Sequence, residues 1–219
     1  ASVCELTVTP AAVQAQNQLD RQALGAVAPR LHAPVVAAIQ RKDSTALAKA
    51  GREFLALATD LDDLLATREE FLLGRWLADA KRWATNARER RLYEFNARNL
   101  ITLWGPRDSI LHEYSQRQWS GMVRGFYGQR WKRFLDRQCA ALVANQPFDA
   151  AKLDAELRAW EEKWNHQAES YPTKPRGNPV TVARRLLTKY HRLCEPDSPS
   201  LTTGKPATCS FALPDHPAH

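Results

Sequence analysis

Apolar residues recur every three or four positions along most of this chain, a spacing that places them on one face of an α-helix. The clearest stripe follows Ser44 and continues through Leu47, Phe54, Leu57, Leu61 and Leu64. No two neighbouring segments show the alternation of paired β-strands. The pattern therefore predicts an all-α protein, a bundle of eight or nine helices with an irregular, Pro-rich C-terminal tail.

Residues that start and stop helices divide this pattern into elements. Pro10 is expected to begin a first helix, which Pro29 and Pro34 should interrupt. Glycines at 121, 125 and 128 predict a kink or turn. Prolines predict a loop over 171–179, before a last helix at 180–191. The helices in between are predicted to begin at capping residues: Ser44, Thr67 with Glu70, Asn86, Asp108 and Asp149.

The domain organisation follows from the same pattern. Residues 1–43 are expected to form N-terminal helices, and residues 44–192 the main helical domain. From 193 to 219 the chain is rich in Pro, Ser and Thr and loses its apolar periodicity. Such a segment cannot bury enough apolar surface to order itself, so we expect a disordered tail.

The formal net charge is +7, and one segment carries the whole excess. Residues 68–137 hold fifteen Lys and Arg against eight Asp and Glu, whereas the rest of the chain balances. This asymmetry favours an acidic partner: nucleic acid, an anionic substrate or an acidic protein surface. Runs 88–91 and 124–134 interleave basic and aromatic residues, as binders of single strands do. The aromatics also fall at helical spacing with leucines, which weighs against nucleic acid.

The cysteines and the first residues of the sequence do not indicate a cellular compartment. Cys4, Cys139, Cys194 and Cys209 match no zinc or CxxC spacing. Unpaired thiols are the simpler interpretation, and a Cys194–Cys209 disulfide is the alternative. The first residues lack the basic and apolar regions of a signal peptide. No apolar run approaches the roughly 20 residues of a membrane span, so we expect no membrane partner.

Motifs for catalysis are missing from the sequence. It contains no G-x-S-x-G, HExxH, P-loop or GxGxxG pattern, and its histidines form no i,i+4 pair. Acidic residues occur as sequence neighbours, which point to different sides of a helix and predict a solvated surface: Asp62-Asp63, Glu69-Glu70 and Glu161-Glu162. We therefore expect no catalytic residue, metal ligand or cofactor on this chain.

One tryptophan has an unusual position. Trp104 is expected at the end of the helix that begins at Asn86, with Gly105 in the left-handed conformation behind it and Pro106 forbidding continuation. A ring at a rigid helix end can stack on the flat face of a ligand such as a sugar. Position alone still favours ordinary packing over this role.

Four segments, in this order, resemble one known family. They read FLLGRWLADAKRWA, YEFNARNLITLWGP, YGQRWKRF and YPTKPRG, and begin at residues 71, 93, 127 and 171. Together they are similar to the C-terminal helical domain of the α-N-acetylglucosaminidases, glycoside hydrolase family 89. The resemblance covers about residues 47–191, with a weaker match over the first forty. One departure is Asn178, where the family usually has Asp, although Asn can also cap a helix.

The resemblance implies a domain that packs on a (β/α)₈ barrel and closes one side of its active-site pocket. In this family the barrel carries two catalytic glutamates, and the retaining enzyme removes terminal α-linked N-acetylglucosamine from glycans. Trp104 matches a pocket-lining position, which reverses the preference for packing. Asn96, Arg98 and Arg176 match positions expected to support the pocket or to lie at the domain interface. The family is mostly secreted, periplasmic or lysosomal.

The chemistry limits what this chain does alone. Retaining glycosidases need two carboxyl groups about 5 Å apart, and no pair of that kind is evident in the sequence. We expect the chain to be inactive by itself, as a fragment or as one domain of a split enzyme. The alternatives are a stand-alone basic module that binds nucleic acid or an acidic partner, and a remnant without a function of its own.

Overall fold

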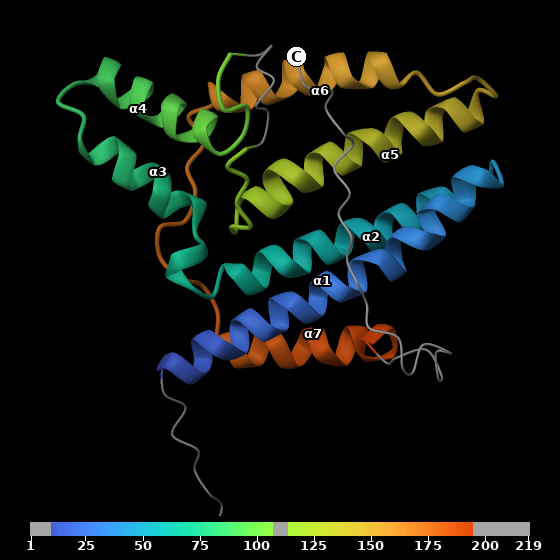
Figure 1. The fold of residues 1–219 in the computed structure, drawn as a ribbon, viewed down its shortest axis with the longest axis horizontal. Helices are drawn as coiled ribbons and strands as arrows, with labels where there is room; N and C mark the ends of the chain where they lie inside the picture. The colour runs from blue at the N-terminus through green and yellow to red at the C-terminus, as the bar shows by residue number, and fades with distance from the viewer. Residues whose placement is uncertain (1–9, 107–113, 195–219) are drawn as a thin grey trace, which may run out of the picture.

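A computed structural model describes residues 10–106 and 114–194, with side chains over 24–106 and 114–193. These residues form seven α-helices, one turn of 3₁₀ helix and one of π helix, and no β-strand. Figure 1 shows most of the helices stacked as neighbouring rods, with α3 and α4 as a hairpin at one end. The elements are α1 (Pro10–Gln40), α2 (Ser44–Leu65), η1 (Glu69–Phe71), α3 (Leu73–Arg82), α4 (Ala87–Leu100), η2 (Val123–Tyr127), α5 (Gly128–Val143), α6 (Ala150–Asn165) and α7 (Pro179–Cys194).

The all-α prediction is confirmed, and the predicted number of helices is too high for the described residues. One reason is that α1 runs unbroken through Pro29 and Pro34, so the predicted interruption is wrong. A proline inside a helix removes a hydrogen bond and costs about 3 kcal/mol. Here α1 buries Val27, Leu31 and Val35 against its neighbours, and each such side chain contributes about 1.5–3 kcal/mol. Packing therefore outweighs the local preference.

The interior consists of three apolar clusters, two around α1 and α2 and one under the α3–α4 hairpin. Two of them join α1 and α2 to α7 and to α5. The third lies under the α3–α4 hairpin and ties it to η2 and α6 through Leu77, Ile101, Phe126 and Trp164. This packing fixes the last turn of α4 against η2 and α6, and so fixes the start of the segment that follows α4.

Several helix starts agree with the sequence. Asn86 Oδ1 accepts hydrogen bonds from the backbone amides of Arg88 and Glu89, at 3.0 Å each. Asp149 Oδ1 accepts from the amide of Lys152 at 2.9 Å. These caps were readable because an N-cap needs only a short polar side chain and the backbone of the next three residues.

Two other helix starts differ from the sequence prediction. Asp43, rather than Ser44, caps α2, and its Oδ1 accepts from the amide of Ala46 at 2.9 Å. The predicted capping box at Thr67 is also wrong. Its hydroxyl donates to Leu64 O at 2.7 Å and closes the end of α2. The helix predicted from Asp108 falls largely on residues 107–113, outside the described residues. Cys209 and residues 195–219 of the predicted tail also lie outside them, whereas residues 193 and 194 belong to α7.

The glycine-rich segment turns as predicted, and a carboxylate fixes the turn. Gly121 adopts φ +93°, which favours glycine. The buried Asp62 accepts from the amides of Gly121 and Arg124 at 2.7 and 3.0 Å, and from Ser120 Oγ at 3.0 Å. Asp62 was expected on a solvated face, and that prediction is wrong because its three partners lie about sixty residues away in the sequence.

Candidate functional site

The segment after α4 folds back tightly on the helix. The amide of Trp104 donates to Asn99 O at 2.8 Å, and the amide of Gly105 donates to Asn99 Oδ1 at 3.3 Å. The hydroxyl of Thr102 lies 2.7 Å from Arg98 O and 2.8 Å from the side-chain amide of Asn165 in α6. The turn is therefore anchored to both α4 and α6.

Trp104 itself, and not Gly105, takes the left-handed backbone conformation, with φ +58°. This corrects the prediction that glycine would occupy that position. The left-handed region costs an L-residue with a side chain about 1–2 kcal/mol, because Cβ approaches the neighbouring carbonyl oxygen. Backbone strain of this kind persists where surrounding contacts fix it, and it is concentrated at ligand sites. The helix also ends at Leu100, four residues before the expected position.

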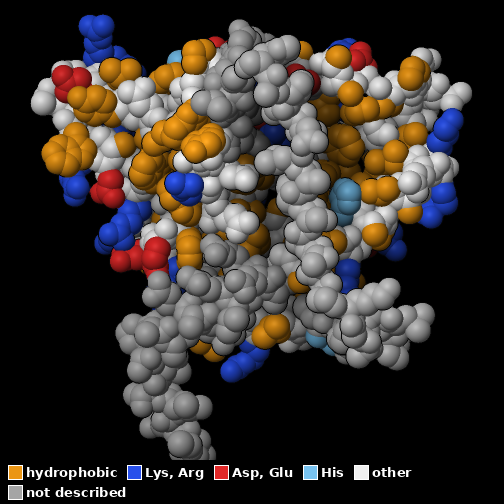
Figure 2. Space-filling view, in the orientation of Figure 1, with side chains coloured by type: hydrophobic (Ala, Val, Ile, Leu, Met, Phe, Trp, Pro, Cys, Tyr) orange, Lys and Arg blue, Asp and Glu red, His pale blue; other side chains and the backbone are white. Residues whose placement is uncertain are grey.

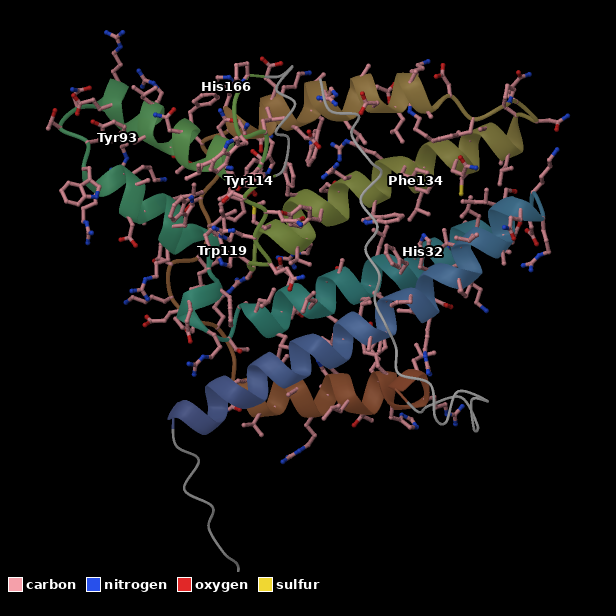
Figure 3. All side chains as sticks on the ribbon, viewed as in Figure 1. His32, Tyr93, Tyr114, Trp119, Phe134 and His166 are labelled. Atoms are coloured by element: carbon pink, nitrogen blue, oxygen red, sulfur yellow. The ribbon has the colours of Figure 1, made fainter. Side chains whose placement is uncertain are left out.

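The Trp104 ring is only partly buried and lies against Tyr114. The two ring centroids are 5.2 Å apart, and the rings are tilted by 53°. Tyr114 is 73% exposed. In Figure 3, Tyr114 and Trp119 lie between the α3–α4 hairpin and the start of α5. The two rings form what we call the aromatic platform, Trp104 with Tyr114. Sequence reasoning missed Tyr114 because nothing local links it to a residue ten positions earlier.

Arg98 belongs to the interior rather than to the platform. Its side chain is fully buried and pairs with Glu94 at 2.9 Å. Its guanidinium faces the rings of Trp164 and Tyr171, at 4.6 and 5.3 Å to the centroids. Burial works to raise the pKa of Glu94, but hydrogen bonds from Lys81 and Arg98 hold it below its usual value. Arg98 thus fixes α4, α6 and the following loop relative to one another.

Asn96 lies on a different side of α4 and is exposed. It lines an apolar groove of about 360 Å³ between α3 and α4, together with Trp76, Trp83 and Leu100. Trp83 is 75% exposed. It comes one residue after α3 ends, so the apolar stripe of that helix no longer directs it inward.

Arg176 lies in the loop before α7. Its amide donates to Ala66 O at 2.8 Å, and its side chain is exposed. In the next turn Asn178 Oδ1 accepts from the amide of Thr181 at 3.1 Å, so the neutral residue does cap α7. The structure therefore places Trp104, Asn96, Arg98 and Arg176 in four separate environments and does not gather them into one site.

A second apolar groove lies along α5 and α6. It has a volume of about 540 Å³ and is lined by Gln116 and Gln118 together with apolar side chains of α5, α6 and the end of η2: Tyr127, Trp131, Phe134, Leu153 and Leu157. We call it the α5–α6 groove. Figure 2 shows hydrophobic side chains gathered over the α3–α4 hairpin and again over α5. The segment from 114 to 120 connects the platform to this groove.

The buried carboxylates of the described residues are paired with other groups of the chain and stabilise the fold. Besides Asp62 and Glu94, Asp60 accepts from Tyr190 and Lys189, and Glu161 pairs with Arg130 at 3.0 Å. Glu161 was expected on a solvated face, which the structure corrects. No group of three or more potential metal-ligating side chains occurs within the described part of the chain. None of its helices is long and apolar enough to cross a membrane.

The basic residues between 68 and 137 are spread over α3, α4 and α5. Many are in ion pairs with acidic side chains, among them Arg75 with Glu69 and Arg137 with Glu156, both at 2.7 Å. Pairing of this kind lowers the local positive potential that a polyanion would meet.

Comparison with known proteins identifies the family. Residues 17–189 match the family described as the alpha-N-acetylglucosaminidase (NAGLU) C-terminal domain. The chain belongs to this family. Human α-N-acetylglucosaminidase is 31% identical to it over 191 residues, which is 87% of this chain and 26% of the human protein.

Solved structures of a family 89 glycoside hydrolase from Clostridium perfringens agree. Its complex with 2-acetamido-1,2-dideoxynojirmycin gives a TM-score of 0.74 at 26% identity, over 84% of this chain and 22% of that one. Its complex with PUGNAc gives 0.74 at 27% identity, over 85% and 22%. A form with two Glu-to-Gln substitutions, bound to its substrate GlcNAc-α-1,4-galactose, gives 0.70 at 26% identity, over 79% and 20%. This chain of the family thus spans about a quarter or less of these relatives.

Proposed function

We propose that this chain is the helical accessory domain of a family 89 α-N-acetylglucosaminidase, which packs on a (β/α)₈ catalytic barrel and lines its pocket for terminal α-N-acetylglucosamine. The barrel supplies the two catalytic carboxylates. The chain supplies an aromatic wall. Family membership supports the coarse assignment, because the human relative is an α-N-acetylglucosaminidase and the bacterial structure is a family 89 glycoside hydrolase. This chain covers 26% of the human protein and 22% of the bacterial one, which leaves room in both for a catalytic domain.

The observation that carries the pocket role is Trp104, which has a strained backbone and is only partly buried. A residue held at φ +58° beside an exposed Tyr114 presents a ring face that the fold does not fully cover. A sugar offers C–H groups on one face, and these pack well on the electron-rich face of an aromatic ring. The turn that holds Trp104 is bonded to α4 and α6, so the ring is already positioned before a ligand arrives.

The docking surface in this proposal is the α5–α6 groove with the segment from 114 to 120. Trp131 is 37% exposed and lies in an aromatic cluster with Phe54 and Phe134. Exposed aromatic side chains around a groove are typical of surfaces that another protein domain covers. Gln116 and Gln118 of the groove follow Tyr114 of the platform by two and four residues, so the same short segment contributes to both.

The test compares Trp104→Ala with Trp83→Ala in the full-length enzyme. Both substitutions remove an indole that is not fully buried, but Trp83 follows the end of α3 and lines the groove between α3 and α4, so it is not part of the aromatic platform. We expect Trp104→Ala to lower kcat/KM on an aryl α-N-acetylglucosaminide about tenfold, the effect of a lost stacking contact. Trp83→Ala should stay within about twofold. Equal effects of the two substitutions on kcat/KM would refute the pocket role.

The stand-alone basic module has no comparable support. Its arginines are distributed over several helices, and many of them pair with carboxylates. No described surface gathers them into the continuous stripe that a nucleic acid backbone needs.

A further inference from the structure

A separate cavity of about 250 Å³ lies on another side of the α3–α4 hairpin, where the loop before α7 covers α3. Its polar lining comes from Lys81 and Arg82 at the end of α3, from Arg90 in α4, and from Ser170 and Thr173 in the loop. None of these residues belongs to the platform or to the α5–α6 groove. Neither the docking proposal nor the pocket role uses them.

The loop wall of this cavity is fixed by close packing at Gly74. A Cβ atom at this position would lie 2.2 Å from Pro172 O and 2.4 Å from Tyr171 O, so only glycine lets the loop backbone rest on α3. Arg98 holds the same loop from behind, because its Nη2 donates to Glu169 O at 3.1 Å. The loop that carries Ser170 and Thr173 is therefore held against α3, and both residues line the same cavity as the basic side chains of the hairpin.

The charges around the cavity do not balance. Lys81 pairs with Glu94 at 2.9 Å, but Glu94 is also the partner of Arg98, so one carboxylate serves two cations. Arg82 pairs with Asp79 at 3.8 Å, a long distance for an ion pair, and its guanidinium carbon lies 5.9 Å from the centroid of the Trp83 ring. Arg90 lines the cavity and makes no ion pair with any residue in the described parts of the chain.

The acidic side chain that lines the cavity is Glu169. Its Oε2 accepts a hydrogen bond from Tyr171 Oη at 3.0 Å. The same cavity is lined by three basic residues, Lys81, Arg82 and Arg90. Behind the wall, Arg98 Nη1 is buried without a hydrogen-bond partner in the described residues. Buried donors are normally satisfied by water or a ligand, so this end of the hairpin has an excess of N–H donors and positive charge.

We propose that this cavity binds a tetrahedral oxyanion, a phosphate or sulfate group, between Arg82, Arg90 and the hydroxyls of Ser170 and Thr173. Guanidinium groups bind such oxygens through paired, charge-assisted hydrogen bonds, and hydroxyls complete the remaining positions. The volume is just below the roughly 300 Å³ at which pockets for larger ligands begin. The ligand is therefore a free ion or an ester group carried by a single sugar.

The test is a titration of the full chain with inorganic phosphate at about 10 mM ionic strength, where charges are screened over roughly 30 Å. Arg90→Gln removes a cavity cation, and Arg91→Gln removes the same charge from an exposed neighbour that does not line the cavity. We expect saturable binding, a Kd about tenfold higher for Arg90→Gln, and a change within about twofold for Arg91→Gln. Absence of saturable binding, or equal losses in both variants, would overturn the proposal.

A second titration separates the two sources of the ligand. Glucose 6-phosphate carries the same group as inorganic phosphate, with a sugar attached. If it binds more than about threefold tighter, and Arg90→Gln removes the gain, the ligand is a sugar ester. Equal binding of both compounds identifies the free ion. Thermal unfolding of the two variants shows whether each retains its fold, since both arginines are exposed and neither substitution should lower Tm by more than about 2 °C.

Discussion

Arg98 of α4 stacks on Trp164 of α6, with its guanidinium carbon 4.6 Å from the ring centroid. The same side chain pairs with Glu94 and donates to Glu169 O in the loop before α7. Helix α4 and the region that runs from the end of α6 into the next loop, about seventy residues further along the chain, thus share one fully buried cation. Arg98 therefore contacts both regions: its carbonyl oxygen accepts from Thr102 in the turn before the platform, and its side chain holds the loop that walls the oxyanion cavity.

Replacing Arg98 by Met tests this role. Met has a similar length but leaves Glu94 with Lys81 alone and the carbonyl of Glu169 without its donor. Removing one partner of a buried ion pair costs about 3–5 kcal/mol. We expect the free energy of unfolding to fall by at least about 3 kcal/mol, and Tm by roughly 6–12 °C. Arg88→Met, an exposed change on the same helix, should alter stability by less than about 0.5 kcal/mol. Similar losses in the two variants would show that the contacts of Arg98 are not important for stability.

The left-handed backbone of Trp104 gives a second prediction. In Trp104→Gly the strain of about 1–2 kcal/mol is relieved, while the contact with Tyr114, worth about 0.5–1.5 kcal/mol, is lost. The two effects offset each other, so we expect urea unfolding to change by less than about 1 kcal/mol. Trp104→Val keeps the strain and loses the ring, and should unfold at least about 1 kcal/mol more easily than the Gly variant. Equal stability of the Gly and Val variants would mean that the conformation carries no cost.

The elements that the sequence predicted well depend on short stretches of chain. The caps at Asn86 and Asp149 and the turn at Gly121 each need only a few consecutive residues. The stripe along α2 needs only helical spacing. Family resemblance then indicated Trp104 as a site residue, and its partly exposed position is compatible with that hypothesis.

The features that the sequence did not predict depend on contacts between segments that are far apart along the chain. α1 continues through two prolines because α2, α5 and α7 cover it. Asp62 is buried because the turn at 120–124 brings three donors to it. The partnership of Trp104 with Tyr114 arises only when the chain returns to the end of α4. No local sequence pattern encodes these long-range contacts, so they can be seen only in the folded chain.

Gly74 and Gly25 form a matched pair for a third prediction. Gly74→Ala places Cβ against the backbone of Pro172, which cannot move without releasing the loop from α3. Overpacking of this kind costs about 1–3 kcal/mol or more. Gly25 is exposed in α1 with nothing within 4 Å of a new Cβ, so Gly25→Ala should stabilise by about 0.5–1 kcal/mol. Guanidinium unfolding measures both. Stabilisation by Gly74→Ala would show that the loop does not rest on α3 as described.

Tyr190 gives a prediction for alkaline pH. Its hydroxyl donates to the buried Asp60 at 2.6 Å. Burial, then the hydrogen bond and charge of Asp60, raise the pKa of Tyr190 above its ordinary value. The folded state therefore keeps the phenolic proton at a pH at which the unfolded state loses it. The stabilisation is complete below about pH 10, the pKa of a free tyrosine, and is lost as pH rises further towards the folded-state pKa.

Tyr190→Phe should therefore cost most near pH 8 and progressively less above pH 10. A hydrogen bond to a charged group is worth about 1.5–3 kcal/mol, and we expect a loss of that size at pH 8. Denaturant unfolding of the wild type and the variant at several pH values measures the difference. Tyr93→Phe, which removes a hydroxyl without a hydrogen bond to any described residue, controls for loss of a phenol and should cost less than about 0.5 kcal/mol. A Tyr190→Phe cost that stays constant or grows above pH 10 would contradict the role of Asp60, because only a proton held in the folded state makes the two curves converge.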